Sequence, residues 1–279
     1  MPAETPDVSP IQPTRPAAPW LGGKRNLAKR LCALIDADAR AGGHSTYAEP
    51  FVGMAGVFLR RQQRPRAEVI NDRARDVANL FRILQRHYPQ FLDTLRFQLT
   101  TRAEFNRLVD TRPETLTDLE RAARFLYLQR TAFGGKVSGR NFGVSRDRPA
   151  RFNLTEVEPM LEDLHSRLSG VVIECLDYAE FITRYDGPGT LFYLDPPYWG
   201  HEADYGKELF APAEFARMAD QLRHMAGRFL LSLNDVPEVR SIFVGFEMQE
   251  LATSYTVAKA TGARGKRQEL LISNFRIGE

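Results

Sequence analysis

The residues of this chain best suited to chemistry are Asp195, Pro196, Pro197 and Tyr198. They follow an apolar run, residues 190–194, that predicts a buried strand, and open α/β sheets bind ligands at the carboxyl ends of their strands. The prolines stiffen the turn and lack backbone N–H groups, which leaves their carbonyls free to accept. A carboxylate, a carbonyl and an aromatic ring together suit an exocyclic amine on a flat ring. An ordinary turn is the alternative, because Asp-Pro and Pro-Tyr are common turn dipeptides.

A second candidate site follows another predicted strand, residues 46–49. The segment Glu49-Pro-Phe-Val-Gly53-Met-Ala-Gly56 contains glycines that let the backbone approach a ligand. Asp72 comes 19 residues after Gly53 at the next predicted strand end, where an acid suits the hydroxyls of a ribose. The phosphate-loop pattern Gly-x4-Gly-Lys-Ser/Thr is missing. The segment therefore indicates a nucleoside ligand without requiring a pyrophosphate, and a generic strand–helix turn is the alternative.

Composition indicates a soluble globular protein. The chain has 279 residues, of which 43% are hydrophobic and 26% are charged. It lacks a run of 18 apolar residues and a basic segment before an apolar core, so we expect neither a transmembrane helix nor a secretory signal. The two cysteines, Cys32 and Cys175, have no metal-ligand spacing and the five histidines are scattered. We therefore expect a cytoplasmic protein with free thiols and no metal.

Basic residues are concentrated in two segments. Residues 130–151 contain six basic side chains and one acidic side chain, Asp147. Residues 258–268 contain four basic side chains and no acidic one. Such clusters can contact the phosphates of a nucleic acid. A solvated surface loop is the alternative for both segments.

Apolar runs that alternate with helical patterns predict a mostly parallel sheet. The candidate strands are residues 46–49, 68–70, 171–175, 190–194, 229–233, 246–257 and 269–275. The candidate helices outside residues 73–168 are residues 26–41 and 212–225.

Two segments do not fit this alternation. Residues 73–168 are too long for one crossover and are expected to be mostly helical, with capping boxes at Thr101-x-x-Glu104 and Thr117-x-x-Glu120. Residues 1–19 contain six of the 17 prolines and little that could build a core, so we expect a disordered lead-in.

Four motifs occur in the order seen in one family. Trp20-Leu-Gly-Gly-Lys24, Glu49-Pro-Phe-Val-Gly53, Asn71-Asp72 and Asp195-Pro-Pro-Tyr198 resemble the Dam-like, D12-class DNA adenine-N6 methyltransferases, as do residues 126–136 and 270–274. The resemblance implies an α/β, Rossmann-like S-adenosylmethionine-dependent methyltransferase fold whose mostly parallel sheet ends in an antiparallel strand. Residues 20–72 plus 169–279 would form the catalytic, cofactor-binding domain, and residues 73–168 an inserted, mainly helical target-recognition domain.

The same resemblance implies the site residues. Asp195, Pro196 and Tyr198 would meet the target base. S-adenosylmethionine would be bound by Trp20, Gly23, Lys24, Glu49, Phe51, Gly53, Asp72, Asp177 and Asp195. From the basic clusters we expect DNA contacts by Arg130, Lys136, Arg140, Arg146, Arg148, Lys259, Arg264, Lys266 and Arg267. One departure is Ala55, which stands where the family often has a second glycine and which we expect to require a negative φ.

The implied function is transfer of a methyl group from S-adenosylmethionine to N6 of a flipped-out adenine in a specific double-stranded DNA sequence. The Asp195 carboxylate and the Pro196 carbonyl would accept the two amino hydrogens, and Tyr198 would replace the lost base stacking. We expect a monomer that needs neither metal nor membrane and works in a bacterial cytoplasm, or in the host cytoplasm if phage-encoded. The alternatives are methylation of cytosine N4 or of RNA adenine, and a catalytically silent DNA-binding regulator or decoy.

Overall fold

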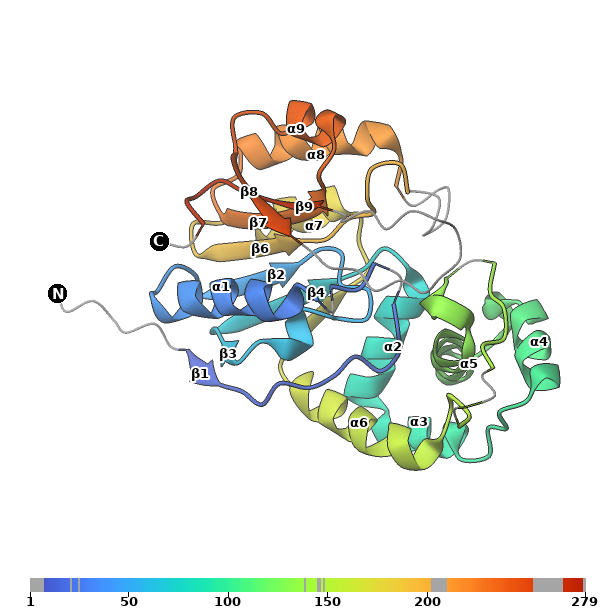
Figure 1. The fold of residues 1–279 in the computed structure, drawn as a ribbon. Coiled ribbons are helices and arrows are strands. Elements are labelled where there is room, and N and C mark those ends of the chain that lie inside the picture. Colours follow the sequence, from blue (N-terminus) through green and yellow to red (C-terminus); the bar gives the residue numbers. More distant parts are fainter. Residues whose placement is uncertain are drawn as a thin grey trace.

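A seven-stranded sheet forms the centre of the protein (Figure 1). The structure, a computed structural model, describes residues 8–20, 22–24, 26–137, 139–144, 147, 149–201, 210–252 and 268–277. In spatial order the strands are β5 (Val172–Glu174), β4 (Ala67–Asn71), β2 (Thr46–Glu49), β6 (Thr190–Leu194), β7 (Arg228–Asn234), β9 (Gln268–Ser273) and β8 (Glu247–Ala252).

Pairing within the sheet changes direction at one place. The five strands from β5 to β7 are parallel, whereas β9 pairs antiparallel with both β7 and β8. This mostly parallel sheet with an antiparallel end confirms the predicted Rossmann-like class. The predicted strands agree with the observed ones to within one or two residues, because buried apolar runs bounded by polar residues mark strands in such sheets. For the run predicted over residues 246–257, residues 253–257 lie outside the described residues.

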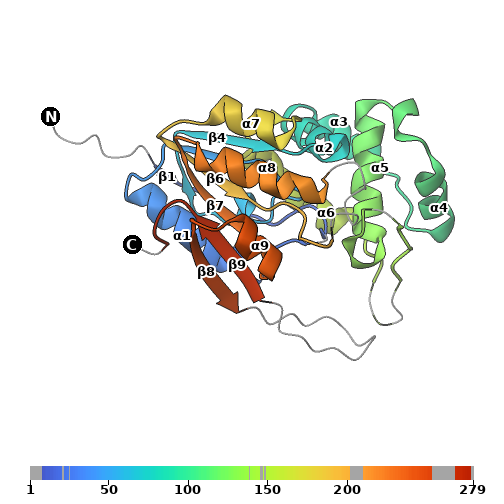
Figure 2. The same ribbon diagram turned by 90° about the horizontal axis from the view of Figure 1, so that it is seen from above.

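Helices cover both faces of the sheet. Successive side chains of β6 point to opposite faces, and each face packs against its own set of helices. Leu191 and Tyr193 enter the apolar cluster that includes α1 (Ala28–Arg40), while Phe192 and Leu194 enter the opposite cluster. That second cluster is completed by α7 (Tyr178–Tyr185), α8 (Pro212–Arg223) and α9 (Pro237–Ile242). Figure 2 shows α1 and α7 on opposite sides of the strands.

The chain between β4 and β5 is mostly helical, as predicted. It forms α2 (Arg75–Arg86), α3 (Tyr88–Leu95), α4 (Arg102–Asp110), α5 (Asp118–Thr131) and α6 (Leu154–Arg167). Two short 3-10 turns, Pro113–Thr115 and Phe133–Gly135, lie within it, and a third, Phe58–Arg60, lies before it. These helices gather at one end of the sheet (Figures 1 and 2). Helix α2 packs mainly on the other helices of this part, α5 above all, and also contacts β5, so it links the helical part to the sheet. The division at residues 73 and 168 stays a prediction.

The two predicted capping boxes differ. At α5 the box is complete, since the Thr117 side chain accepts from the Glu120 N–H and the Glu120 carboxylate accepts from the Thr117 N–H. At α4 only half of the box forms. Thr101 caps the helix, but the Glu104 carboxylate binds Arg107 instead of returning to the cap.

The prediction of a disordered N-terminal segment is wrong for residues 8–19, while residues 1–7 lie outside the described residues. Strand β1 (Ser9–Pro10) pairs with β3 (Gln63–Arg64), and the side chains of Ala17 and Ala18 are buried. The Ala17 carbonyl accepts a hydrogen bond from Arg130 Nη1 at 2.6 Å. The segment is ordered by hydrogen bonds from residues far away in the sequence and by an apolar surface against which it packs. Such contacts cannot be inferred from the composition of the segment, which favours disorder.

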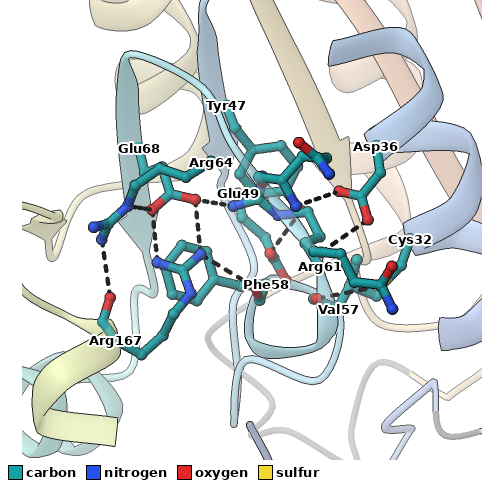
Figure 3. A network of polar contacts seen from close by, with 12 residues as sticks. Cys32, Asp36, Tyr47, Glu49, Val57, Phe58, Arg61, Arg64, Glu68 and Arg167 are labelled. Carbon is teal, nitrogen blue, oxygen red and sulfur yellow. Dashed lines mark hydrogen bonds and ion pairs between the residues drawn. The ribbon is translucent and has the colours of Figure 1, made fainter. Parts of the chain in front are cut away.

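A buried ion cluster joins β4 to α6 (Figure 3). Glu68 is 3% exposed and accepts from Arg61, from Arg64 Nε at 2.9 Å, and from Arg167 Nη1 and Nη2 at 2.6 and 2.7 Å. Burial alone would raise the pKa of Glu68, but the surrounding guanidinium groups, that of Arg61 first, lower it to about 2. Glu68 is therefore ionised at every pH at which the protein is expected to be folded.

We predict that Glu68→Ala destabilises the fold by about 3–5 kcal/mol, because it leaves buried guanidinium groups without their counter-ion. Urea unfolding followed by circular dichroism measures the loss. The matched control is Glu180→Ala, which removes an exposed partner of Arg184 and should cost less than about 0.5 kcal/mol. Equal losses in the two variants would show that the cluster contributes nothing specific.

Candidate active site

A cavity of about 1650 Å³ opens where the parallel strands end and the helical part begins. Its walls include the residues that follow β2, β4 and β6, together with Arg130 and Phe142 from the helical part. The carboxyl edge of an open α/β sheet is where such folds bind their ligands. The volume exceeds the roughly 300–1000 Å³ that is usual for one small ligand, so two occupants can lie side by side.

Eight of the nine predicted cofactor-binding residues line this cavity. They are Trp20, Gly23, Lys24, Glu49, Phe51, Gly53, Asp72 and Asp195. The ninth, Asp177, does not line it, although its neighbours Leu176 and Tyr178 do. The Asp177 carboxylate accepts from the Ala179 N–H at 3.0 Å as the N-cap of α7, and it lies 3.3 Å from Arg73. This geometry gives Asp177 a structural role and no support for a cofactor contact.

Gly53 allows the turn after β2 to approach an indole ring. Its φ is +49°, and a Cβ at this position would lie 2.5 Å from Trp20 Nε1. Trp20 in turn meets Phe125 of α5 edge to face, with ring centroids 6.4 Å apart. The indole therefore connects the turn at the sheet edge to the helical part across one wall of the cavity.

Ala55 departs from our prediction of a negative φ, because its φ is +58°. The turn imposes this conformation from both sides. The Ala55 N–H donates to the Val52 carbonyl at 2.7 Å, and the Ala55 carbonyl accepts from the Leu59 N–H at 3.0 Å. Its side chain is fully buried, so the residue cannot relax outward. A left-handed alanine costs about 1–2 kcal/mol, a strain that the turn carries beside the cavity.

Two carboxyl groups on the sheet side of the cavity have raised pKa values. Asp72 accepts from the N–H groups of Gly53 and Ala74, each at 2.9 Å, and burial raises its pKa to about 6 in spite of these bonds. Four lone pairs on a carboxylate leave room for two ligand hydroxyls besides these two donors. Burial raises the pKa of Glu49 to about 8, and Glu49 accepts from the Tyr47 hydroxyl at 2.8 Å.

Asp195 is paired with a lysine. Its Oδ1 lies 2.9 Å from Lys24 Nζ and 3.3 Å from Ser232 Oγ, and its side chain is 21% exposed. Burial raises the pKa of Asp195 to about 6, while the Lys24 ammonium acts in the opposite direction. Lys24 is only 2% exposed, so its ammonium is a buried partner of this carboxylate and not a surface charge.

Tyr198 is half-buried and its hydroxyl faces the protein. The hydroxyl donates to Glu269 Oε1 at 2.5 Å and accepts from Lys24 Nζ, which lies 4.1 Å from the ring centroid. Pro197 lines the cavity, and both prolines of the turn are buried. The structure thus brings Asp195 and Tyr198 together around one ammonium group.

Three residues that no sequence motif indicated hold this turn. Glu269 binds Tyr198, and Asn234 binds the main chain of Trp199 with both amide atoms, accepting from its N–H at 2.9 Å and donating to its carbonyl at 3.1 Å. Ser232 reaches Asp195. For Glu269 and Asn234 the available signal was their position near the ends of otherwise apolar strands, whereas Ser232 is a polar residue inside the apolar run of β7.

The described basic residues have different surroundings. Arg130 is tied to the carbonyls of Ala17 and Arg151, and burial lowers its pKa. Arg140 is half-buried, with a pKa lowered by burial to about 10, whereas Lys136 is exposed. The remaining predicted DNA contacts lie outside the described residues: Arg146, Arg148, Lys259, Arg264, Lys266 and Arg267. The geometry favours a structural role for Arg130, and phosphate contacts by the others stay predictions.

Among the residues that the structure describes, no group of three or more His, Cys, Asp and Glu side chains is placed to hold a metal ion. Within the same ranges, no helix combines the length and the apolar character needed to cross a bilayer.

Comparison with known proteins points to one family. The family model for the D12 class N6 adenine-specific DNA methyltransferases matches residues 20–257. A type II methyltransferase, M.CviBI, from Paramecium bursaria Chlorella virus NC1A is 24% identical over 94% of this chain and 100% of its own length. M1.LlaDCHI, a type II methyltransferase of Lactococcus lactis subsp. cremoris, is also 24% identical, over 94% of this chain and 95% of its own. A DNA N-6-adenine-methyltransferase of Escherichia phage P1 is 26% identical over 90% of this chain but only 34% of its own length.

We predict that Gly53→Ala destabilises the fold by about 1–3 kcal/mol, because the new methyl group meets Trp20 and the backbone has a positive φ. Thermal unfolding gives the loss, and tryptophan fluorescence reports the displaced indole. Gly56→Ala is the matched control, since its Cβ would meet nothing closer than Arg60 Nη1 at 3.6 Å. An unchanged fluorescence spectrum for Gly53→Ala would contradict the close contact.

Proposed function

The chain belongs to the D12 class of N6 adenine-specific DNA methyltransferases, and we propose that it takes the methyl group from S-adenosylmethionine inside the cavity at the sheet edge. Its activity is the methylation of adenine N6 in DNA. The observation that carries the proposal is the placement of Asp195, a partly exposed carboxylate at the cavity wall directly after β6.

The cavity residues fit this methyl donor. Phe51 contributes an aromatic wall with Tyr178 and Phe210, at centroid distances of 5.4 and 6.0 Å, which suits a purine. Asp72 has the acceptor capacity for a ribose diol, and the turn at Gly53 packs directly against Trp20, whose indole lines the same cavity. S-adenosylmethionine, when bound, supplies a methyl group activated by a sulfonium sulfur, so the chemistry requires no metal.

Asp195 acts on the amine that receives the methyl group. Its carboxylate and the Pro196 carbonyl accept the two N6 hydrogens, which frees the nitrogen lone pair from the ring for in-line attack. As the new N–C bond forms and the C–S bond breaks, positive charge moves to N6, and the fixed carboxylate stabilises it. N6 then loses one proton, which an Asp195 carboxylate with a raised pKa is suited to accept.

A target base must leave the duplex to reach this turn. We propose that the base stacks on Tyr198, one side of which lies beside the Lys24 ammonium. Stacking therefore uses the other face of the ring or requires Lys24 to move. Since two relatives are named type II methyltransferases and a third comes from a phage, we infer a defined double-stranded recognition sequence and a role in restriction–modification or phage protection. A monomer acting in the bacterial or host cytoplasm stays a prediction.

We predict that Asp195→Ala lowers methylation at least about 100- to 1000-fold, the usual cost of losing one group that stabilises transition-state charge. The protein is expressed in a methylation-free bacterium, and modified bases are mapped by long-read sequencing, which reports base and site together. Asp220→Ala, on the exposed face of α8, is the control and should methylate normally. Comparable N6-methyladenine from the Asp195→Ala variant would reject the assigned role, and methylated cytosine would reject the base.

We predict that activity falls as the pH drops through about 6, because the ionised Asp195 carboxylate accepts hydrogens and its pKa is raised to about 6. In Lys24→Gln the ammonium that lowers this pKa is gone. The acid limb of kcat/KM should therefore move to higher pH than in the wild-type enzyme. A limb that stays in place, or moves to lower pH, would show that Lys24 does not act on Asp195.

A further inference from the structure

We propose that Glu269 is a positioning residue for methyl transfer, whose carboxylate holds Lys24 and Tyr198 and thereby fixes the turn that carries Asp195. The inference deepens the proposed function and rests on it. Glu269 lies on β9, beyond residues 20–257 that the family model matches.

Glu269 is a buried carboxylate aimed at the candidate active site. It is 1% exposed, its Oε1 accepts from the Tyr198 hydroxyl at 2.5 Å, and its Oε2 lies 3.4 Å from Lys24 Nζ. The same Nζ lies 2.9 Å from Asp195 Oδ1. One ammonium is thus shared by two carboxylates. A buried carboxylate is costly to keep unless it is paired and hydrogen-bonded, so both bonds of Glu269 constrain its neighbours.

Sharing the lysine changes what Asp195 can do. If Lys24 were bound by Asp195 alone, its charge would neutralise the carboxylate that must accept the amine hydrogens. Glu269 draws part of that charge away and adds a second negative charge close by, which raises the pKa of Asp195. Asp195 therefore keeps its affinity for a developing positive charge.

The polar and titratable groups around Asp195 come from four strands and from the segment before α1. Lys24 precedes α1, Glu49 ends β2, Tyr193 lies on β6 beside Ser232 of β7, and Glu269 lies on β9. Among these described groups Lys24 is the single cation. Exchanging Glu269 for an uncharged residue therefore changes the charge balance at Asp195 in one direction.

A second residue, Asn234, also holds the turn after Asp195, and it pairs with Glu269 across neighbouring strands. Glu269 stands opposite Asn234 in the β7–β9 ladder, and Asn234 binds both main-chain polar groups of Trp199. Two facing residues thus hold consecutive positions of the chain, Glu269 through the Tyr198 hydroxyl and Asn234 through the Trp199 backbone. The antiparallel strand β9 therefore supports the turn after Asp195 from outside the parallel part of the sheet.

The test is Glu269→Gln, which keeps the shape of the side chain and removes its charge. We expect kcat to fall about 10- to 100-fold, because neither the bond from Tyr198 nor the contact with Lys24 would then be made to a charged group. KM for DNA and for S-adenosylmethionine should change less than about threefold, because the substrates are not bound by Glu269. The acid limb of kcat/KM should move to lower pH, opposite to the shift expected for Lys24→Gln.

Two further variants keep the test decisive. Glu247→Gln makes the same chemical change at an exposed position of the same hairpin and should leave kcat and its pH profile unchanged. Tyr198→Phe removes the hydroxyl that Glu269 holds. It should lower kcat, and its effect should not add to that of Glu269→Gln. If Glu269→Gln fails to fold, an unchanged kcat in Tyr198→Phe still overturns the proposal.

The outcomes separate this inference from the proposed function. A wild-type enzyme that transfers no methyl group from S-adenosylmethionine to adenine would sink the function itself. An active wild-type enzyme with a Glu269→Gln variant of equal kcat and unshifted pH profile would overturn the inference alone. A folded variant whose loss lies wholly in KM would also overturn it, because Glu269 would then act in binding.

Discussion

A carboxylate taken out of water must be paired, and the pairing of Asp195 with Lys24 at 2.9 Å is the constraint on which this site depends. Lys24 also contacts Tyr198 and lies 3.4 Å from Glu269, so the cation joins the segment before α1 to the turn after β6 and to β9. Those three segments are far apart in sequence. Their meeting at one ammonium requires the sheet order β6-β7-β9, which places the antiparallel end beside the catalytic turn.

The opposite wall of the cavity depends on backbone geometry. Gly53 and Ala55 both have positive φ, and the Gly53 N–H is fixed by Asp72 at 2.9 Å. The turn can hold a strained alanine because hydrogen bonds on both sides of Ala55 leave it no other conformation. Strain of this kind gathers where backbone must approach a ligand. The hydrogen bonds of Gly53 and Ala55 thus hold this wall of the cavity in a strained backbone conformation.

Local patterns predicted the parallel part of the sheet and the three acids at its edge. Its strands are short and mostly apolar, and Glu49, Asp72 and Asp195 were found because they stand where such runs end. Spacing could not reveal partners from distant segments. Glu269 lies 71 positions after Tyr198, and Arg130 holds the carbonyl of Ala17 from 113 positions away. Nor could composition predict order in residues 8–19 or the φ of Ala55, since surrounding structure overrides the intrinsic preference in both places.

The protein contains two buried ion clusters with opposite balances, and the balance accounts for their roles. At Glu68 one carboxylate meets the guanidinium groups of three arginines, and its pKa is lowered to about 2. At Asp195 two carboxylates share one ammonium, and burial, with a smaller contribution from Glu269, raises the pKa of Asp195 to about 6. The excess of cations keeps Glu68 ionised, and its ion pair with Arg167 holds β4 against α6. An excess of carboxylates leaves unsatisfied negative potential at the cavity, and an amine that gains positive charge during methylation is the species that such a potential stabilises.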